Sequence, residues 1–146
     1  MKKLLSTMIM IVTAAVFCDS PVSAGTRHDI MSCSISVDYA HNEINRFSYD
    51  RDFDVSANAP YNEDIGTRLR FGAFSATMAV ENSVPVVSIF FDRDVSAFNE
   101  VSFNAKMPLT GRVDSMAGGN EFRTSAPSSA GAHKTEYILT CKKAAK

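Results

Sequence analysis

Residues 32–39, Ser-Cys-Ser-Ile-Ser-Val-Asp-Tyr, alternate polar and apolar side chains without a break. Successive side chains of an extended strand point to opposite faces, so Cys33, Ile35, Val37 and Tyr39 share one face. The other face carries only serine and aspartate. This stretch therefore predicts a β-strand with one buried face and one solvated face.

The same period of two recurs along the chain. It is clear over residues 47–56, 95–107 and 134–142, whereas no segment after residue 30 carries a long apolar stripe with the helical period. Over residues 67–81 the apolar positions change face near residues 72–74, which predicts a β-bulge there. Six or seven short strands of this kind predict an all-β, single-domain antiparallel β-sandwich, with a small β-barrel as the alternative.

The first 24 residues have the composition of an export signal. Two lysines precede an apolar run over residues 4–17, and Val22-Ser23-Ala24 places small residues before a cut at Gly25. Because the apolar run is too short to span a bilayer, we expect residues 1–24 to be removed and no stable membrane insertion to remain. The start resembles bacterial export signals, so the expected location is periplasmic or secreted, with residues 25–146 forming the mature domain.

Cysteine use agrees with export. Cys18 falls in the signal, next to the bulky Phe17 that argues against lipid attachment, and the mature chain keeps Cys33 and Cys141. Both lie on the apolar faces of their expected strands, so we predict one disulfide joining the first and last strands. A disulfide requires the two Cα atoms to be within about 7 Å, so these strands should be neighbours or face each other across the core.

Residues 108–133 differ from the rest because they are rich in glycine, serine and alanine. We predict an irregular segment here, interrupted by at most one short strand near residues 121–124. If the segment is ordered for binding, its candidate contact residues are Arg112, Met116, Asn120, Phe122 and Arg123, since aromatic and arginine side chains are enriched at interface hot spots. The competing interpretation is a core Phe122 within a disordered connector.

Two groups of residues are candidate metal ligands. Asp50, Asp52 and Asp54 form an acidic run, but the glycine and glutamate that an EF-hand loop requires are absent, so a solvated face competes with calcium binding. A signal cut after Gly25 instead of Ala24 would begin the chain Thr26-Arg27-His28, a site suited to Cu(II) or Ni(II). We therefore predict no cofactor and keep metal binding as a separate hypothesis.

The sequence contains no catalytic motif such as H-E-x-x-H, G-x-S-x-G or a P-loop. Ser128, Ser129 and His133 are close in sequence, but a nucleophile and its base are recognised by geometry on a rigid scaffold. We expect no catalytic residues and predict that the protein is not an enzyme.

Charge narrows the class of partner. Without residues 1–24 the chain loses two lysines and one aspartate, so its formal net charge changes from −1 to −2, and its basic residues are scattered. A nucleic-acid-binding protein is expected to carry a stripe of basic residues, which this sequence lacks, so nucleic acid is excluded as the partner. We therefore predict a non-enzymatic binding protein of the cell envelope, whose partner is another protein or an envelope component. The alternatives are an inhibitor of an extracellular hydrolase, acting through residues 108–133, and a protein that binds calcium or copper.

Overall fold

The computed structural model describes residues 30–96, 99–127 and 129–143. The described residues form eight strands, β1 Met31–His41, β2 Ile44–Val55, β3 Tyr61–Asp64, β4 Gly72–Glu81, β5 Val84–Asp94, β6 Glu100–Pro108, β7 Val113–Thr124 and β8 Gly131–Lys143. They build two antiparallel four-stranded sheets, in the orders β2-β1-β8-β7 and β3-β4-β5-β6. The predicted signal, Cys18 and His28 lie outside the described residues.

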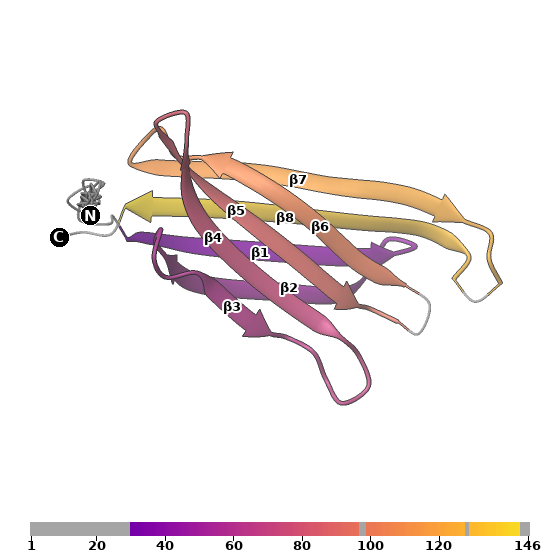
Figure 1. Cartoon of the computed structure of the whole chain (residues 1–146). Coiled ribbons are helices and arrows are strands. Elements are labelled where there is room, and N and C mark those ends of the chain that lie inside the picture. The colour runs from indigo at the N-terminus through magenta and orange to yellow at the C-terminus, as the bar shows by residue number, and fades with distance from the viewer. Residues whose placement is uncertain (1–29, 97–98, 128, 144–146) are drawn as a thin grey trace, which may run out of the picture.

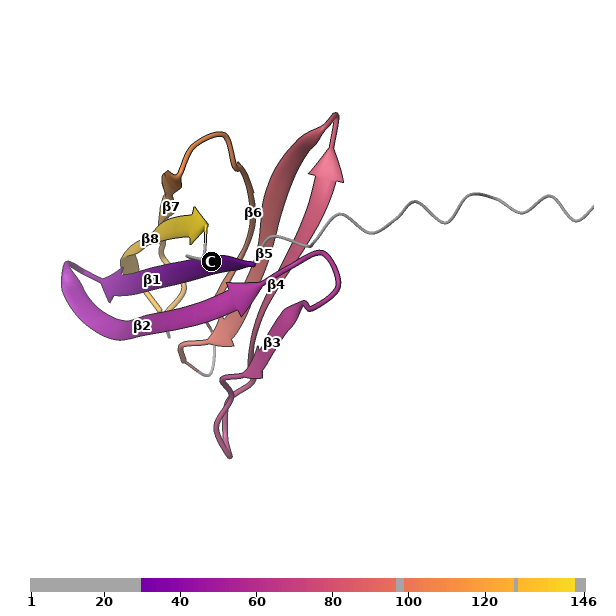
Figure 2. The same ribbon diagram turned by 90° about the vertical axis from the view of Figure 1, so that its left-hand side faces the viewer.

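The two sheets pack face to face, with the strands of one running obliquely across those of the other (Figure 1). Each sheet keeps two separate edges, so the fold is an open sandwich and the barrel alternative is wrong. A view from the side shows the sheets as two layers (Figure 2). The sequence prediction of an all-β sandwich is confirmed.

The core consists of the apolar faces that the alternation predicts. Along β1 the side chains of Cys33, Ile35, Val37 and Tyr39 are all buried. Aromatic rings fill the space between the sheets, where Phe74 of β4 contacts Tyr49 and Phe53 of β2 at ring-centroid distances of 5.7 and 5.2 Å. Burial of these large side chains supplies most of the favourable free energy of folding.

The predicted disulfide is confirmed. Cys33 lies directly opposite Cys141 in the antiparallel β1–β8 pair, with a Cα–Cα distance of 4.0 Å and a sequence separation of 108. Of the two arrangements left open by the sequence, the terminal strands are therefore neighbours in one sheet. The bond closes almost the whole domain into one covalent loop.

The prediction of an irregular segment over residues 108–133 is wrong for most of its length. Val113–Thr124 forms the 12-residue strand β7, which pairs with β8. Gly118 and Gly119 favour a break in a strand when judged from the sequence alone. In the structure the ring of Tyr137 lies across Gly118, where an added Cβ would come within 2.4 Å of the tyrosine hydroxyl oxygen. The tyrosine ring covers the gap that the missing side chain leaves, so the strand continues through the glycines.

The predicted bulge near residues 72–74 is absent. β4 begins only at Gly72 and pairs with β5 in an unbroken register. The apolar Leu69 and Phe71, which the sequence reading placed on a strand, are exposed outside it. The β1–β2 pair contains a register shift instead, between Tyr39 and Ala40.

Candidate binding site

The connection between β3 and β4, residues 65–71, presents apolar side chains to solvent. We call it the Leu69 turn. Leu69 is 92% exposed and Phe71 is 59% exposed, and Arg68 and Arg70 flank Leu69. The turn projects beyond the two sheets (Figures 1 and 2). Leu69 and Phe71 line one hollow together with the exposed Phe90, so the turn is part of an apolar surface and is a candidate contact surface.

Backbone hydrogen bonds hold the Leu69 turn in one conformation. The N–H of Thr67 donates to the carbonyl oxygen of Arg70 (2.7 Å), and the N–H of Arg70 donates back to Thr67 (3.3 Å), closing a two-residue turn around Arg68 and Leu69. At its base, the N–H of Ile65 donates to the carbonyl oxygen of Gly72 (3.0 Å). The backbone pairing of the β3–β4 hairpin therefore continues to the tip of the turn.

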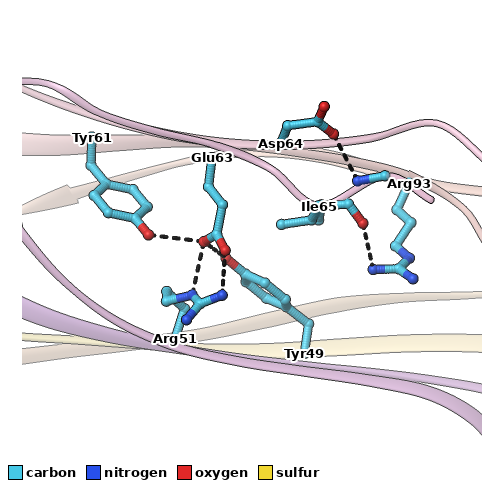
Figure 3. Close-up of polar contacts among 8 residues, drawn as sticks. Tyr49, Arg51, Tyr61, Glu63, Asp64, Ile65 and Arg93 are labelled. Atoms are coloured by element: carbon cyan, nitrogen blue, oxygen red, sulfur yellow. Dashed lines mark hydrogen bonds and ion pairs between the residues drawn. The ribbon is translucent and has the colours of Figure 1, made fainter. Parts of the chain in front are cut away.

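The end of β5 braces the same turn from one side. The N–H of Phe71 donates to Oδ2 of Asp94 (3.1 Å), while the N–H of Asp94 donates to the carbonyl oxygen of Phe71 (3.1 Å). A guanidinium N–H of Arg93 donates to the carbonyl oxygen of Ile65 (2.9 Å), as Figure 3 shows. Arg70 also bonds the carbonyl oxygen of Val95. A turn held at both arms loses little conformational entropy when a partner binds its tip.

Two glycines allow the arms of the turn to lie close together. A Cβ at Gly66 would come within 3.0 Å of the carbonyl oxygen of Arg70, and one at Gly72 would come within 3.0 Å of the Gly66 nitrogen. Any larger residue would force these backbones apart. The local sequence therefore favours a narrow, rigid hairpin over a wide loop.

A shallow hollow lies beside the turn on the outer face of the β3-β4-β5-β6 sheet. Its volume is about 920 Å³, and the side chains of Leu69, Phe71 and Phe90 contribute apolar surface to it. Asn62, Asp64 and Ser75 also line it. The exposed leucine thus belongs to a continuous mixed surface of turn and sheet that a partner protein can cover.

A hydrogen-bonded cluster around Glu63 fixes β3, the strand that leads into the turn, against the other sheet (Figure 3). Oε2 of Glu63 accepts hydrogen bonds from the hydroxyls of Tyr49 (2.9 Å) and Tyr61 (2.8 Å) and from Nε of Arg51 (2.8 Å). Oε1 accepts a second bond from Arg51, which completes a two-point ion pair. The cluster joins β2 of one sheet to β3 of the other.

These contacts change the pKa values of the cluster. Burial by itself would raise the pKa of Glu63, but the hydrogen bonds from Tyr61, Tyr49 and Arg51 and the charge of Arg51 outweigh it, so the pKa is lowered. Burial, together with the hydrogen bond to Glu63, raises the pKa of Tyr49 and of Tyr61. At neutral pH the glutamate is therefore ionised and both tyrosines are hydrogen-bond donors.

Removing the charge of Glu63 is expected to destabilise the domain in a pH-dependent way. We expect Glu63→Gln to lower the free energy of unfolding at pH 7 by about 1 to 3 kcal/mol, because Arg51 loses its ionised partner. A lowered folded-state pKa gives stability that is complete above the unfolded value of 4.5 and lost as the pH falls through the folded value. The difference between wild type and variant, measured by urea denaturation, should therefore shrink below about pH 4.5.

Glu43→Gln at the exposed β1–β2 turn is the matched control for this measurement. The same atoms change in both variants, but Glu43 lies outside the cluster, so its effect should stay within about 0.5 kcal/mol. A Glu63→Gln variant with the stability of the Glu43→Gln variant at every pH would contradict the assigned role of the cluster.

The five contact residues predicted from the sequence lie on β7 or just before it. Met116, Asn120 and Phe122 share the face of β7 that is turned toward the other sheet, because they pair with the inward-facing residues of β8. Arg123 points to the opposite face, and Arg112 precedes the strand. The strand thus gathers three of the five on one face, and their role in binding stays a prediction. The sequence prediction did not include the Leu69 turn, although the alternation of arginine with an apolar residue in Arg68-Leu69-Arg70-Phe71 is a visible signal.

The proximity of Ser129 and His133 in the sequence has a structural explanation. His133 is fully buried, with Nδ1 2.8 Å from the hydroxyl of Tyr39 and Nε2 2.8 Å from the carbonyl oxygen of Ser129. A carbonyl only accepts, so Nε2 carries a proton, and Nδ1 shares a hydrogen bond with the hydroxyl of Tyr39. The two ring nitrogens are thus bonded to the hydroxyl of Tyr39 and to a backbone carbonyl, and the contact with Ser129 is through its main chain. Ser128 lies outside the described residues.

The predicted metal ligands gain no support. Asp50, Asp52 and Asp54 project from β2 into solvent opposite serines of β1, and Ser32 donates to Oδ1 of Asp54 (2.7 Å). Within residues 30–96, 99–127 and 129–143, no three His, Cys, Asp or Glu side chains are placed to hold a metal ion together. The same part of the chain contains no helix long and apolar enough to cross a membrane.

Comparison with known proteins adds no family. Neither a protein-family model nor a curated protein matches this chain. The candidate site therefore rests on the exposure of Leu69 and on the hydrogen bonds that brace its turn. An apolar tip and a rigid base are the two properties that make this turn the candidate site.

Proposed function

We propose that this chain is an exported, non-enzymatic binding protein of the cell envelope, and that it recognises another protein through the Leu69 turn. The observation that carries the proposal is a leucine with 92% of its surface exposed at the tip of a hairpin whose two arms are hydrogen-bonded to β5, one through Phe71 and the other through Ile65. Export is supported by the signal-like residues 1–24 and by the Cys33–Cys141 disulfide.

The chemistry of the turn indicates what the partner surface contains. Leu69 requires an apolar pocket, and the exposed Arg68 beside it requires a carboxylate or another acceptor at the rim of that pocket. Arg70 is already bonded to the carbonyl oxygen of Val95, so it holds the turn in shape. The expected partner is therefore a folded protein with an apolar pocket that has acidic residues at its rim.

Inhibition of an extracellular hydrolase stays as the second candidate function, because the Leu69 turn is rigid and protrudes. Residues 108–133, which the sequence predicts as the inhibitory segment, contain the paired strand β7. The Leu69 turn closes over two residues, whereas a loop that mimics a substrate enters a cleft in an extended conformation. The geometry of the turn therefore favours binding to a preformed pocket of a partner protein over inhibition of a hydrolase by mimicry of its substrate.

A charged residue at the tip should abolish recognition. We expect Leu69→Asp to reduce capture of the partner at least about tenfold, because the buried anchor of a small interface carries most of its binding energy. The measurement is affinity capture by tagged mature protein from envelope extract of the producing cells, with recovered proteins quantified by mass spectrometry and tested for hydrolase activity.

Ile138→Asp is the matched control, since Ile138 is also exposed and apolar (54%) but lies on β8, on the outer face of the other sheet. The two variants make the same change of charge, so general effects on solubility cancel. A partner captured equally by wild type and Leu69→Asp, but lost from Ile138→Asp, would refute recognition through the turn. A recovered hydrolase that the wild-type protein inhibits would establish the second candidate.

A further inference from the structure

The sheet β2-β1-β8-β7 ends at β7, whose outer edge pairs with no strand among the described residues. Its 12 residues leave a row of backbone donors and acceptors on that side. Such an edge is a template for pairing with another strand.

The other three sheet edges are protected in ways that β7 is not. β3 has only four residues, and the Glu63 cluster ties it to β2, the edge of the opposite sheet. β6 carries Lys106 and ends at Pro108, and both residues discourage pairing. β2 also lacks lysine and proline, but Asp50, Asp52 and Asp54 line its exposed face and the Glu63 cluster fixes it to β3. β7 has no lysine, no proline and no such acidic row, so it is the edge best suited to strand addition.

The side chains of β7 allow a close approach. Ser115, Ala117, Gly118 and Gly119 are small. Phe122 is 46% exposed, with one face of its ring stacked on His133 at 4.7 Å and 5°. Met116 lies on the same face of the strand as Phe122. The edge therefore combines an accessible backbone with two apolar side chains, Met116 and Phe122, that the domain buries only in part.

We propose that β7 pairs with β7 of a second copy of this chain, forming a two-fold antiparallel dimer with one continuous eight-stranded sheet. A two-fold axis perpendicular to the sheet keeps each face on its own side, so opposing residues are either both odd-numbered or both even-numbered. An axis through Gly119 places Met116 opposite Phe122 of the second copy, and Asp114 opposite its Thr124. It also places Ala117 opposite Glu121 of the second copy.

The neighbouring registers are less favourable. An axis through Gly118 places the carboxylate of Asp114 opposite the ring of Phe122, although that carboxylate already accepts bonds from Thr110 and Gly111. An axis through Asn120 places Phe122 opposite Gly118, where the ring of Tyr137 occupies the space. Pairing about Gly119 opposes no like charges and buries both copies of Phe122 against methionine.

Ala117 provides a test that distinguishes these registers, because it is exposed on the outer face. Ala117→Glu places a negative charge opposite Glu121 of the second copy, and Ala117→Lys places a positive charge there. Each change occurs twice in a two-fold dimer, so we expect the first to weaken and the second to tighten dimerisation by about two- to thirtyfold. The measurement is sedimentation equilibrium of the oxidised mature protein from about 1 µM to about 1 mM.

Circular dichroism and thermal denaturation of both variants show whether the monomer fold is unchanged. A wild-type protein that dimerises, with the two variants shifted in these opposite directions, supports the dimer about Gly119. The reverse pattern, tighter for Ala117→Glu, overturns this register because an axis through Asn120 places Ala117 opposite Arg123. Equal dissociation constants for all three proteins also overturn this register, because an axis through Gly118 places Ala117 opposite the uncharged Gly119. A wild-type protein that stays monomeric at about 1 mM overturns β7 pairing altogether.

Discussion

Replacing both cysteines, Cys33→Ala together with Cys141→Ala, is expected to lower the free energy of unfolding of the mature protein by about 2 to 5 kcal/mol. The bond joins residues separated by 108 positions, so its loss releases almost the whole chain in the unfolded state. Chain entropy alone assigns about 4.7 kcal/mol to a loop of this size. Equilibrium unfolding in urea measures the effect, and reduction of the wild-type protein should reproduce it.

The adjacent cross-strand pair provides the control for the disulfide. Ser34 faces Thr140 one position along the same two strands, and the pair is not buried in the core. Ser34→Ala with Thr140→Ala should change the free energy of unfolding by less than about 1 kcal/mol. Equal stability of the double-cysteine variant and this control would show that the first and last strands are held together mainly by other contacts.

Truncating Phe74 is expected to have the largest effect of any single substitution named here. Phe74 is 1% exposed, and its ring contacts Tyr49, Phe53 and Tyr61 of the two edge strands β2 and β3. Phe74→Ala therefore leaves a cavity at the point where the sheets meet, and should lower the free energy of unfolding by about 3 to 5 kcal/mol. Denaturation in urea measures this loss.

Phe71→Ala is the matched control for Phe74→Ala, since the same side chain is removed three residues earlier. Phe71 is 59% exposed on the Leu69 turn, so the expected change is within about 0.5 kcal/mol. Comparable losses from the two variants would mean that Phe71 packs in the core, and the position of the turn would then be wrong.

The alternation of residues 32–39 and 134–142 is sufficient to predict two strands that each bury one face, but their pairing as neighbours in one sheet is known only from the structure. Both cysteines fall on the apolar face, and the disulfide follows from that placement. Over residues 67–81 the same reasoning fails. Leu69 and Phe71 continue an apolar period of two, but the close contact between Gly66 and Gly72 turns the chain before the strand begins.

The strand β7 was missed for a different physical reason. Local composition disfavours a strand at Gly118 and Gly119, and only the cross-strand ring of Tyr137, about 20 residues later, makes it favourable. The Glu63 cluster likewise depends on residues from two strands in two sheets. Its one local signal is Arg51, a charged residue on the apolar face of its strand that requires an acidic partner.

The most direct test of recognition through the Leu69 turn is site-specific photo-cross-linking in the producing cells. A photoreactive amino acid is placed at position 69 in one strain and at position 138 in another, and the products are separated by mass. We expect irradiation to give one discrete adduct from position 69, containing a partner protein, and none from position 138. An adduct from position 138, with none from position 69, would contradict recognition through the turn.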